Sequence, residues 1–106
     1  MSYEQEHRLD DLVTDAESFL RKIKALWLAC LDDEQRTKDL RFAAIEAEHP
    51  DWGPARIYRL LGRETWEKTP LGRAHRRKRS AEKWKLRAEH LLAERKRARD
   101  QYRWGG

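Results

Sequence analysis

The stretch from His49 to Arg79 reads HPDWGPARIYRLLGRETWEKTPLGRAHRRKR, and it decides how the rest of the chain is organised. It contains all three prolines of the sequence and three of its five glycines. Because a residue that precedes proline avoids the α conformation, His49 and Gly53 mark helix boundaries. Pro54 suits the first turn of a new helix. The stretch therefore predicts a helix that stops, a short helix, and a further helix that carries dense positive charge.

The short helix is expected over Pro54–Leu61, with Gly62 in the left-handed position that commonly ends a helix. Helical spacing places one side of this helix toward a core and its arginines outward. The residues expected inside are Ile57, Leu60 and Leu61, and those expected outside are Arg56, Arg59 and Arg63. Trp52 and Trp66 flank the helix, and their large rings are expected to close a miniature core.

The run H-P-x-W-G-x-x-R-I-x-x-L-L over His49–Leu61 is similar to the helix-turn-helix of bacterial insertion-sequence transposases. The pattern I-x-x-x-L-G over Ile57–Gly62, followed by Thr65, is similar to many bacterial and phage DNA-binding helix-turn-helix units. The resemblance covers about residues 49–79, under a third of the chain. It implies that the short helix supports a recognition helix that follows it. Nothing in the sequence corresponds to a transposase catalytic domain, so at most the binding module is shared.

The sequence leaves two arrangements open for the start of the recognition helix. Pro70 and Gly72 interrupt a helix that would begin at Thr65. Either Thr65–Lys68 forms a short turn, or the helix begins later, with Thr69 as its cap and Pro70 in its first turn. The later start is favoured.

A long C-terminal helix is expected from Pro70 to about Trp104. Its first turns carry positive charge at nearly every position, namely Arg73, Arg76, Arg77, Lys78 and Arg79, together with His75. Like charges four residues apart repel, and a polyanion would remove that cost while releasing its own counterions. A weak seven-residue seam follows at Ala81, Trp84, Ala88, Leu91, Ala98 and Tyr102. This succession resembles the layout of basic-zipper proteins, and packing against the N-terminal helix is the simpler use of the seam.

The N-terminal half predicts two helices separated by carboxylates. Apolar residues at steps of three and four define an amphipathic helix over Leu9–Leu31, after a frayed Met1–Arg8. Asp32–Glu34 is expected to end that helix and to cap a second one over residues 33–48, rather than to form a metal or acid–base site. A coiled-coil seam on the first helix also permits two copies to pair, through Leu9, Leu12, Phe19, Ile23, Leu26 and Trp27.

Charge is divided unequally along the chain. With 106 residues, 41% of them charged and 39% apolar, the chain is expected to form one small domain with a modest core. Residues 1–52 hold 7 Lys and Arg against 13 Asp and Glu, a net charge of −6, whereas residues 53–106 hold 17 against 6, a net charge of +11. Such asymmetry indicates that the basic half binds a polyanion. It equally permits the acidic half of one copy to meet the basic half of another.

Several classes of protein are not supported by the sequence. Cys30 is the only cysteine, so no intrachain disulfide can form, and no zinc-ligand spacing is present. No glycine-rich phosphate loop and no serine nucleophile motif occur, so we expect neither an enzyme nor a cofactor. No apolar run reaches the length of a membrane span, and no signal-peptide pattern is seen. We therefore expect no membrane partner and a cytoplasmic location.

Taken as a whole, the sequence predicts a single all-α domain over residues 1–106, with a helix-turn-helix core, a long N-terminal amphipathic helix and a long basic C-terminal helix extending over 80–104. We expect a small transcriptional regulator, or a phage or mobile-element factor, that binds double-stranded DNA as a dimer. The expected DNA contacts are Arg56, Arg59, Arg63, Thr65, Lys68, Arg73, Arg76, Arg77, Lys78, Arg79 and Lys83. The alternatives are a helical protein-interaction factor, such as a phage-type inhibitor or assembly protein that binds an acidic protein surface, and an RNA-binding protein.

Overall fold

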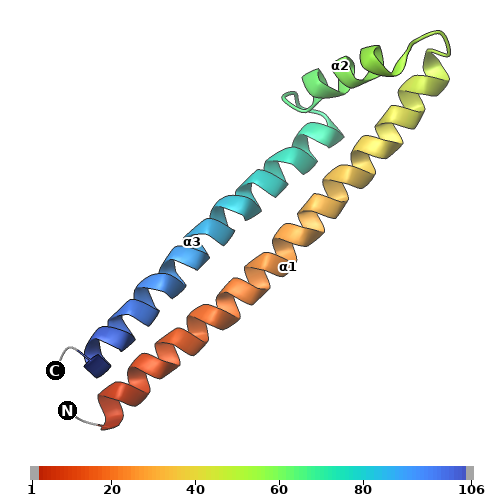
Figure 1. Cartoon of the computed structure of the whole chain (residues 1–106). Helices are drawn as coiled ribbons and strands as arrows, with labels where there is room; N and C mark the ends of the chain where they lie inside the picture. The colour runs from red at the N-terminus through yellow and green to blue at the C-terminus, as the bar shows by residue number, and fades with distance from the viewer. Residues whose placement is uncertain (1–2, 105–106) are drawn as a thin grey trace. The chain divides into compact units, whose positions relative to one another are not determined.

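The structure, a computed structural model, describes residues 3–104, which form three α-helices and no strand (Figure 1). The helices are α1 (Tyr3–Glu48), α2 (Pro54–Glu64) and α3 (Pro70–Trp104). The all-α class expected from the sequence is confirmed, and so is the single helix from Pro70 to Trp104. The predictions that concern Met1, Ser2 and the two terminal glycines fall outside the described residues.

The N-terminal half forms one continuous helix, so the predicted break at Asp32–Glu34 is wrong. No glycine or proline precedes Pro50, and nothing in the backbone therefore interrupts the 46 residues of α1. The carboxylates bind other side chains instead of capping a helix; Asp32, for example, pairs with Arg36 one turn later at 2.8 Å. The segment Tyr3–Arg8, which was expected to fray, also belongs to α1.

The chain divides into two compact units, and both α1 and α3 contribute to each of them. The first unit combines Met1–Leu26 with Glu82–Gly106, and the second unit is Trp27–Ala81. In the first unit the two helical segments run antiparallel: Arg103 pairs with Asp10 at 3.0 Å, and Arg95 donates a hydrogen bond to the carbonyl of Leu12 at 2.9 Å. Its buried apolar residues are few and mostly small, which lets the segments approach closely: Val13, Ala16, Leu20 and Ala88.

The second unit is organised around α2, which packs on segments of both long helices (Figure 1). Its core consists of Ile45 from α1, Ile57 and Leu61 from α2, and Leu71 from α3. The inward positions predicted for Ile57 and Leu61 are confirmed, because both side chains are buried. Half-buried apolar residues surround this core, and they include the predicted Trp52 and Leu60 together with Phe42. Burial of each large core side chain contributes about 1.5–3 kcal/mol.

A buried carboxylate also fixes α2 against α1. Glu64, which is only 8% exposed, accepts a hydrogen bond from Arg41 Nε at 2.8 Å. This hydrogen bond raises the pKa of Arg41 above its ordinary value, even though burial opposes the shift. The Arg41 guanidinium therefore stays protonated in the folded protein. Because loss of Arg41 would leave the Glu64 carboxylate buried without its counter-charge, the pair constrains where the last turn of α2 lies.

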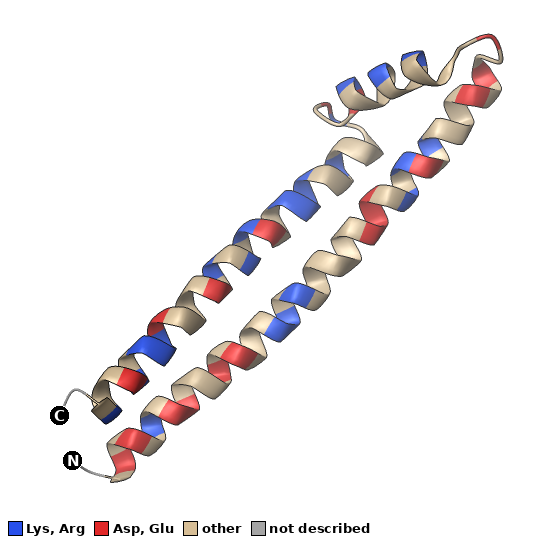
Figure 2. Cartoon of the chain, viewed as in Figure 1, with Lys and Arg blue, Asp and Glu red and all other residues tan. Residues whose placement is uncertain are grey.

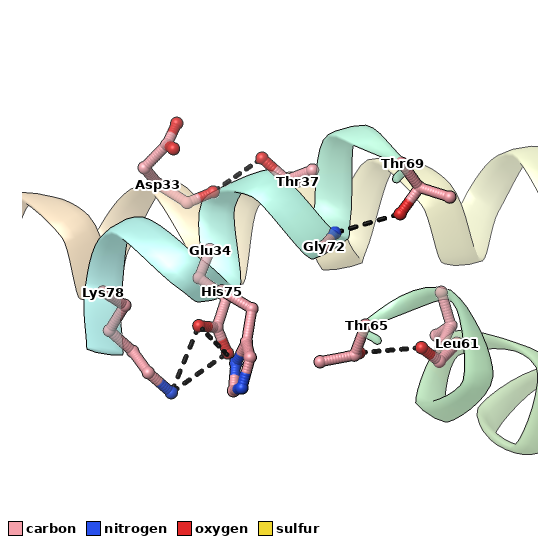
Figure 3. Close-up of polar contacts among 9 residues, drawn as sticks. All are labelled: Asp33, Glu34, Thr37, Leu61, Thr65, Thr69, Gly72, His75 and Lys78. Atoms are coloured by element: carbon pink, nitrogen blue, oxygen red, sulfur yellow. Dashed lines mark hydrogen bonds and ion pairs between the residues drawn. The ribbon is translucent and has the colours of Figure 1, made fainter. Parts of the chain in front are cut away.

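The end of α2 differs from the prediction. The helix continues through Gly62 to Glu64, so the predicted left-handed terminus at Gly62 is wrong. Thr65 is the C-cap, and its hydroxyl donates a hydrogen bond to the carbonyl of Leu61 at 2.8 Å (Figure 3). The helix is therefore closed by a threonine side chain rather than by the conformational freedom of glycine.

The start of α3 agrees with the later of the two predicted starts. The Thr69 hydroxyl accepts a hydrogen bond from Gly72 N at 3.0 Å, which is the contact expected of an N-cap (Figure 3). The same hydroxyl donates to the carbonyl of Glu64 at 2.7 Å. Thr69 thereby ties the start of α3 to the end of α2, and Pro70 occupies the first helical position as predicted.

Gly72 lies where α3 passes close to the preceding turn. A Cβ atom at this position would clash with the carbonyl oxygen of Glu67 and would lie 3.1 Å from that of Glu64. We therefore expect Gly72→Ala to lower the free energy of unfolding by about 2 kcal/mol or more, because overpacking forces the backbone to move. The measurement is chemical denaturation followed by circular dichroism.

Gly62→Ala is the matched control for this substitution. A Cβ atom at Gly62 would meet nothing within 4 Å, and Gly62 lies inside α2. Alanine favours the helix there, so we expect the free energy of unfolding to rise by up to about 1 kcal/mol. Equal stability of the two variants would contradict the close approach at Gly72.

Candidate nucleic-acid interface

The second unit separates its charges between its helices (Figure 2). Its α1 part and the following turn, residues 27–51, hold 3 Lys and Arg against 7 Asp and Glu, a net charge of −4. Residues 53–79, which include α2 and the start of α3, hold 9 Lys and Arg against 2 Asp and Glu, a net charge of +7. One of those two acids is the buried Glu64, so the solvent-facing charge of this segment is almost entirely positive.

The first basic cluster lies along α2. Its arginines are exposed, and together with Trp52 they line a shallow hollow of about 390 Å³, here called the α2 hollow: Trp52, Arg56, Arg59, Leu60 and Arg63. The Arg56 guanidinium lies over the Trp52 ring at 4.2 Å, and the His49 ring stacks on the same tryptophan at 3.8 Å. Within the described residues, Arg59 and Arg63 have no acidic partner. The hollow therefore presents two uncompensated guanidinium groups next to an apolar wall.

The second basic cluster lies at the start of α3 and comprises Arg73, Arg76 and Arg79, all exposed. Arg76 donates a hydrogen bond to the carbonyl of Glu67 at 3.2 Å, and the Arg79 guanidinium lies 5.7 Å from the centre of the Trp66 ring. These contacts hold the two side chains near the turn without neutralising their charge. The Arg73 guanidinium has no polar partner in the part of the chain that the structure describes.

The other basic residues at the start of α3 pair with the acids of α1. Lys78 Nζ lies 3.1 Å from Glu34 Oε2, and His75 Nδ1 lies 3.2 Å from the same oxygen (Figure 3). Arg77 pairs with Asp33 at 3.0 Å. Of these side chains Lys78 and Glu34 are each only 20% exposed, whereas Arg77 remains open to solvent. The basic run that looked uniform in the sequence is therefore divided between a side that faces α1 and a side that faces solvent.

The remaining predicted contact residues have three different settings. Thr65 is half-buried, and its hydroxyl is already used to close α2. Lys68 is exposed in the turn before α3. Lys83 is exposed on α3 but belongs to the first unit, so it is not one of the residues that the second unit brings together.

The exposure of Trp66 to solvent was not predicted from the sequence. It was expected to close the miniature core, but its side chain is 68% exposed, so that prediction is wrong. The neighbouring Trp52 does pack against the core, as predicted. The difference arises because Trp66 follows the end of α2, in a turn whose direction is fixed by the hydrogen bonds of Thr65 and Thr69.

The residues predicted to pair two copies lie mainly in the first unit, where they are not its most buried positions. Leu9, Leu12 and Ile23 are half-buried, whereas Phe19 and Leu26 are exposed. The seam that packs within the chain is offset and uses Val13, Ala16 and Leu20. Trp27, which belongs to the second unit, is half-buried. Association of two copies stays a prediction.

Comparisons with protein-family models, with curated proteins and with solved structures found no match to this chain. Within residues 3–104, no three His, Cys, Asp or Glu side chains are grouped so that they could hold a metal ion. No helix in the same range has a segment long and apolar enough to cross a membrane.

The division of the basic run predicts different stability effects for its two sides. Lys78→Met removes the charge that faces Glu34 but keeps the apolar stem, and we expect it to lower the free energy of unfolding by roughly 1–2 kcal/mol. Arg73→Met is the matched control, and it should change stability by less than about 0.5 kcal/mol because Arg73 is exposed and unpaired. Urea denaturation measures both, and a larger loss for Arg73→Met would contradict the division.

Proposed function

We propose that this protein binds double-stranded DNA through α2 and the first turns of α3. The observation that carries the proposal is that Arg59, Arg63 and Arg73 are exposed and have no acidic partner among the described residues. They belong to a segment whose net charge is +7, while Asp33 and Glu34 of α1 are paired with Arg77 and Lys78. A protein surface that holds guanidinium groups together without counter-charges is suited to bind a polyanion.

Phosphates match this arrangement in both energy and geometry. Arg59 and Arg63 lie one turn apart on α2, and like charges at that spacing cost a few tenths of a kcal/mol in the free protein. Neutralisation by phosphate removes this cost and releases counterions from the DNA, which produces strong and salt-dependent binding. The planar guanidinium also offers paired donors that fit phosphate oxygens, and in the major groove it fits the edge of guanine.

The proposed DNA contacts form two groups, one on α2 and one at the start of α3. In a helix-turn-helix, a supporting helix contacts the backbone while the start of a second helix enters the major groove. By this analogy the α2 arginines would bind phosphates, and Arg73 and Arg76 at the start of α3 would lie nearest the bases. Lys78 and Thr65 contribute little in this proposal, because both are already bonded within the second unit. Exposed Arg77 would exchange Asp33 for a phosphate.

The test is a salt titration of duplex binding by the full chain and by a triple variant, Arg59→Gln, Arg63→Gln and Arg73→Gln. Fluorescence anisotropy with a labelled duplex of mixed sequence measures the affinity. We expect the variant to bind at least about tenfold more weakly at moderate salt, and the slope of log affinity against log salt to fall by about 0.9 for each lost phosphate contact. Glutamine has nearly the helix propensity of arginine, so circular dichroism should be unchanged.

The control removes the same number of charges from another exposed part of the chain, by Arg21→Gln, Lys22→Gln and Lys24→Gln in α1. If binding is local to α2 and the start of α3, this variant keeps most of the affinity and nearly the full salt slope. Equal losses for the two triple variants would show that net charge alone governs binding. No affinity for the duplex at low salt would overturn the proposal and favour an acidic protein partner.

A further inference from the structure

Trp66 is held in a fixed position although most of its side chain is exposed. Its backbone N–H donates to the carbonyl of Arg63 at 3.1 Å, and the N–H of Glu67 donates to the carbonyl of Glu64 at 3.2 Å. The Thr69 hydroxyl binds that same Glu64 carbonyl. The turn that carries the tryptophan is therefore constrained by hydrogen bonds on both sides, and the ring is not a side chain on a freely moving loop.

The contacts of the ring leave most of its surface open. The His75 ring meets it edge-on, with ring centres 5.1 Å apart and planes inclined by 74°. The Arg79 guanidinium lies 5.7 Å from the ring centre. These contacts orient the indole and place the positive charge of Arg79 over the ring at long range, yet the residue remains 68% exposed. A large aromatic surface is thus displayed next to exposed cations, at the junction of α2 and α3.

We propose that Trp66 is a stacking platform for one unpaired base of DNA bound at this interface. The inference rests on the proposed DNA binding and specifies the class of substrate: duplex DNA that contains a base outside the stack, as at a bulge, a junction or a single-stranded end. Every base has an aromatic face that stacks on tryptophan, and the adjoining phosphates are attracted by cations. A nucleotide engages both parts of this surface, because its base stacks on the ring while its phosphate attracts the arginines.

Three ligands that share one duplex sequence separate base stacking from backbone contact. The first is fully paired, the second has a single bulged adenine, and the third has an abasic bulge at the same place. The abasic bulge retains the kink and flexibility of the bulged duplex, which themselves affect affinity. We expect the full chain to bind the adenine bulge roughly 5- to 150-fold more tightly than the abasic bulge, the range given by stacking of one base.

Variants at Trp66 test whether the preference for the adenine bulge comes from the indole ring. Trp66→Ala should bind the adenine and abasic bulges equally and should keep the affinity for the paired duplex. Trp66→Phe should retain part of the preference. The control is Trp104→Ala, because Trp104 is 87% exposed at the end of α3 and belongs to the first unit; it should change no ratio. All three variants should fold, since neither tryptophan is buried.

Each outcome decides between the two proposals. Equal binding of the adenine and abasic bulges by the full chain would overturn the stacking role and leave duplex binding intact. A preference that persists in Trp66→Ala would also overturn it. Binding to none of the three ligands at low salt would overturn the DNA-binding proposal itself, and the stacking proposal with it.

Discussion

The arrangement of the second unit depends on how α2 is held against α1. The buried cluster that holds α2 among the described residues contains only two residues of that helix, Ile57 and Leu61, and so small a contact constrains the rotation of an 11-residue helix weakly. The ion pair between Arg41 and the buried Glu64 adds a directional constraint at the last turn of that helix. Once this turn is fixed, the α2 arginines can only face solvent, and the Glu64 carbonyl is in place to receive the Thr69 hydroxyl that starts α3.

The charges of the second unit then serve two purposes. Acids of α1 bind the side of α3 that carries Arg77 and Lys78, which stabilises the packing of the two helices. Arg73 and Arg76, which lie across α3 from Lys78, have no acidic side-chain partner in the described chain. In a helix that was basic on every side, like charges on successive turns would repel one another and the helix would pack poorly. Neutralising one side therefore lets the helix belong to a core while the other side still carries the charge that a polyanion would bind.

Much of the fold could be predicted because the decisive signals are local. The prolines and Thr69 set the start of two helices, and the spacing of Ile57 and Leu61 identified the buried side of α2. The break expected at Asp32–Glu34 is wrong because no glycine or proline interrupts the backbone there, and the carboxylates pair with other side chains along a continuous helix. Here the partners of Asp33 and Glu34 lie more than 40 positions away in sequence, at Arg77 and Lys78. The sequence of α1 alone gives no sign of contacts with residues so far away along the chain.

The candidate site could be predicted from the sequence less completely than the fold. Composition identified the basic segment, but it could not separate Lys78, which faces Glu34, from Arg73, which faces solvent, because both belong to one run of charges. Trp66 was misjudged for a related reason: an aromatic residue beside a short apolar helix usually completes a core. Its exposure follows from the path of the turn, which is set by Thr65 and Thr69 and by the close approach at Gly72. The feature that distinguishes this surface from an ordinary basic helix is thus a product of tertiary structure.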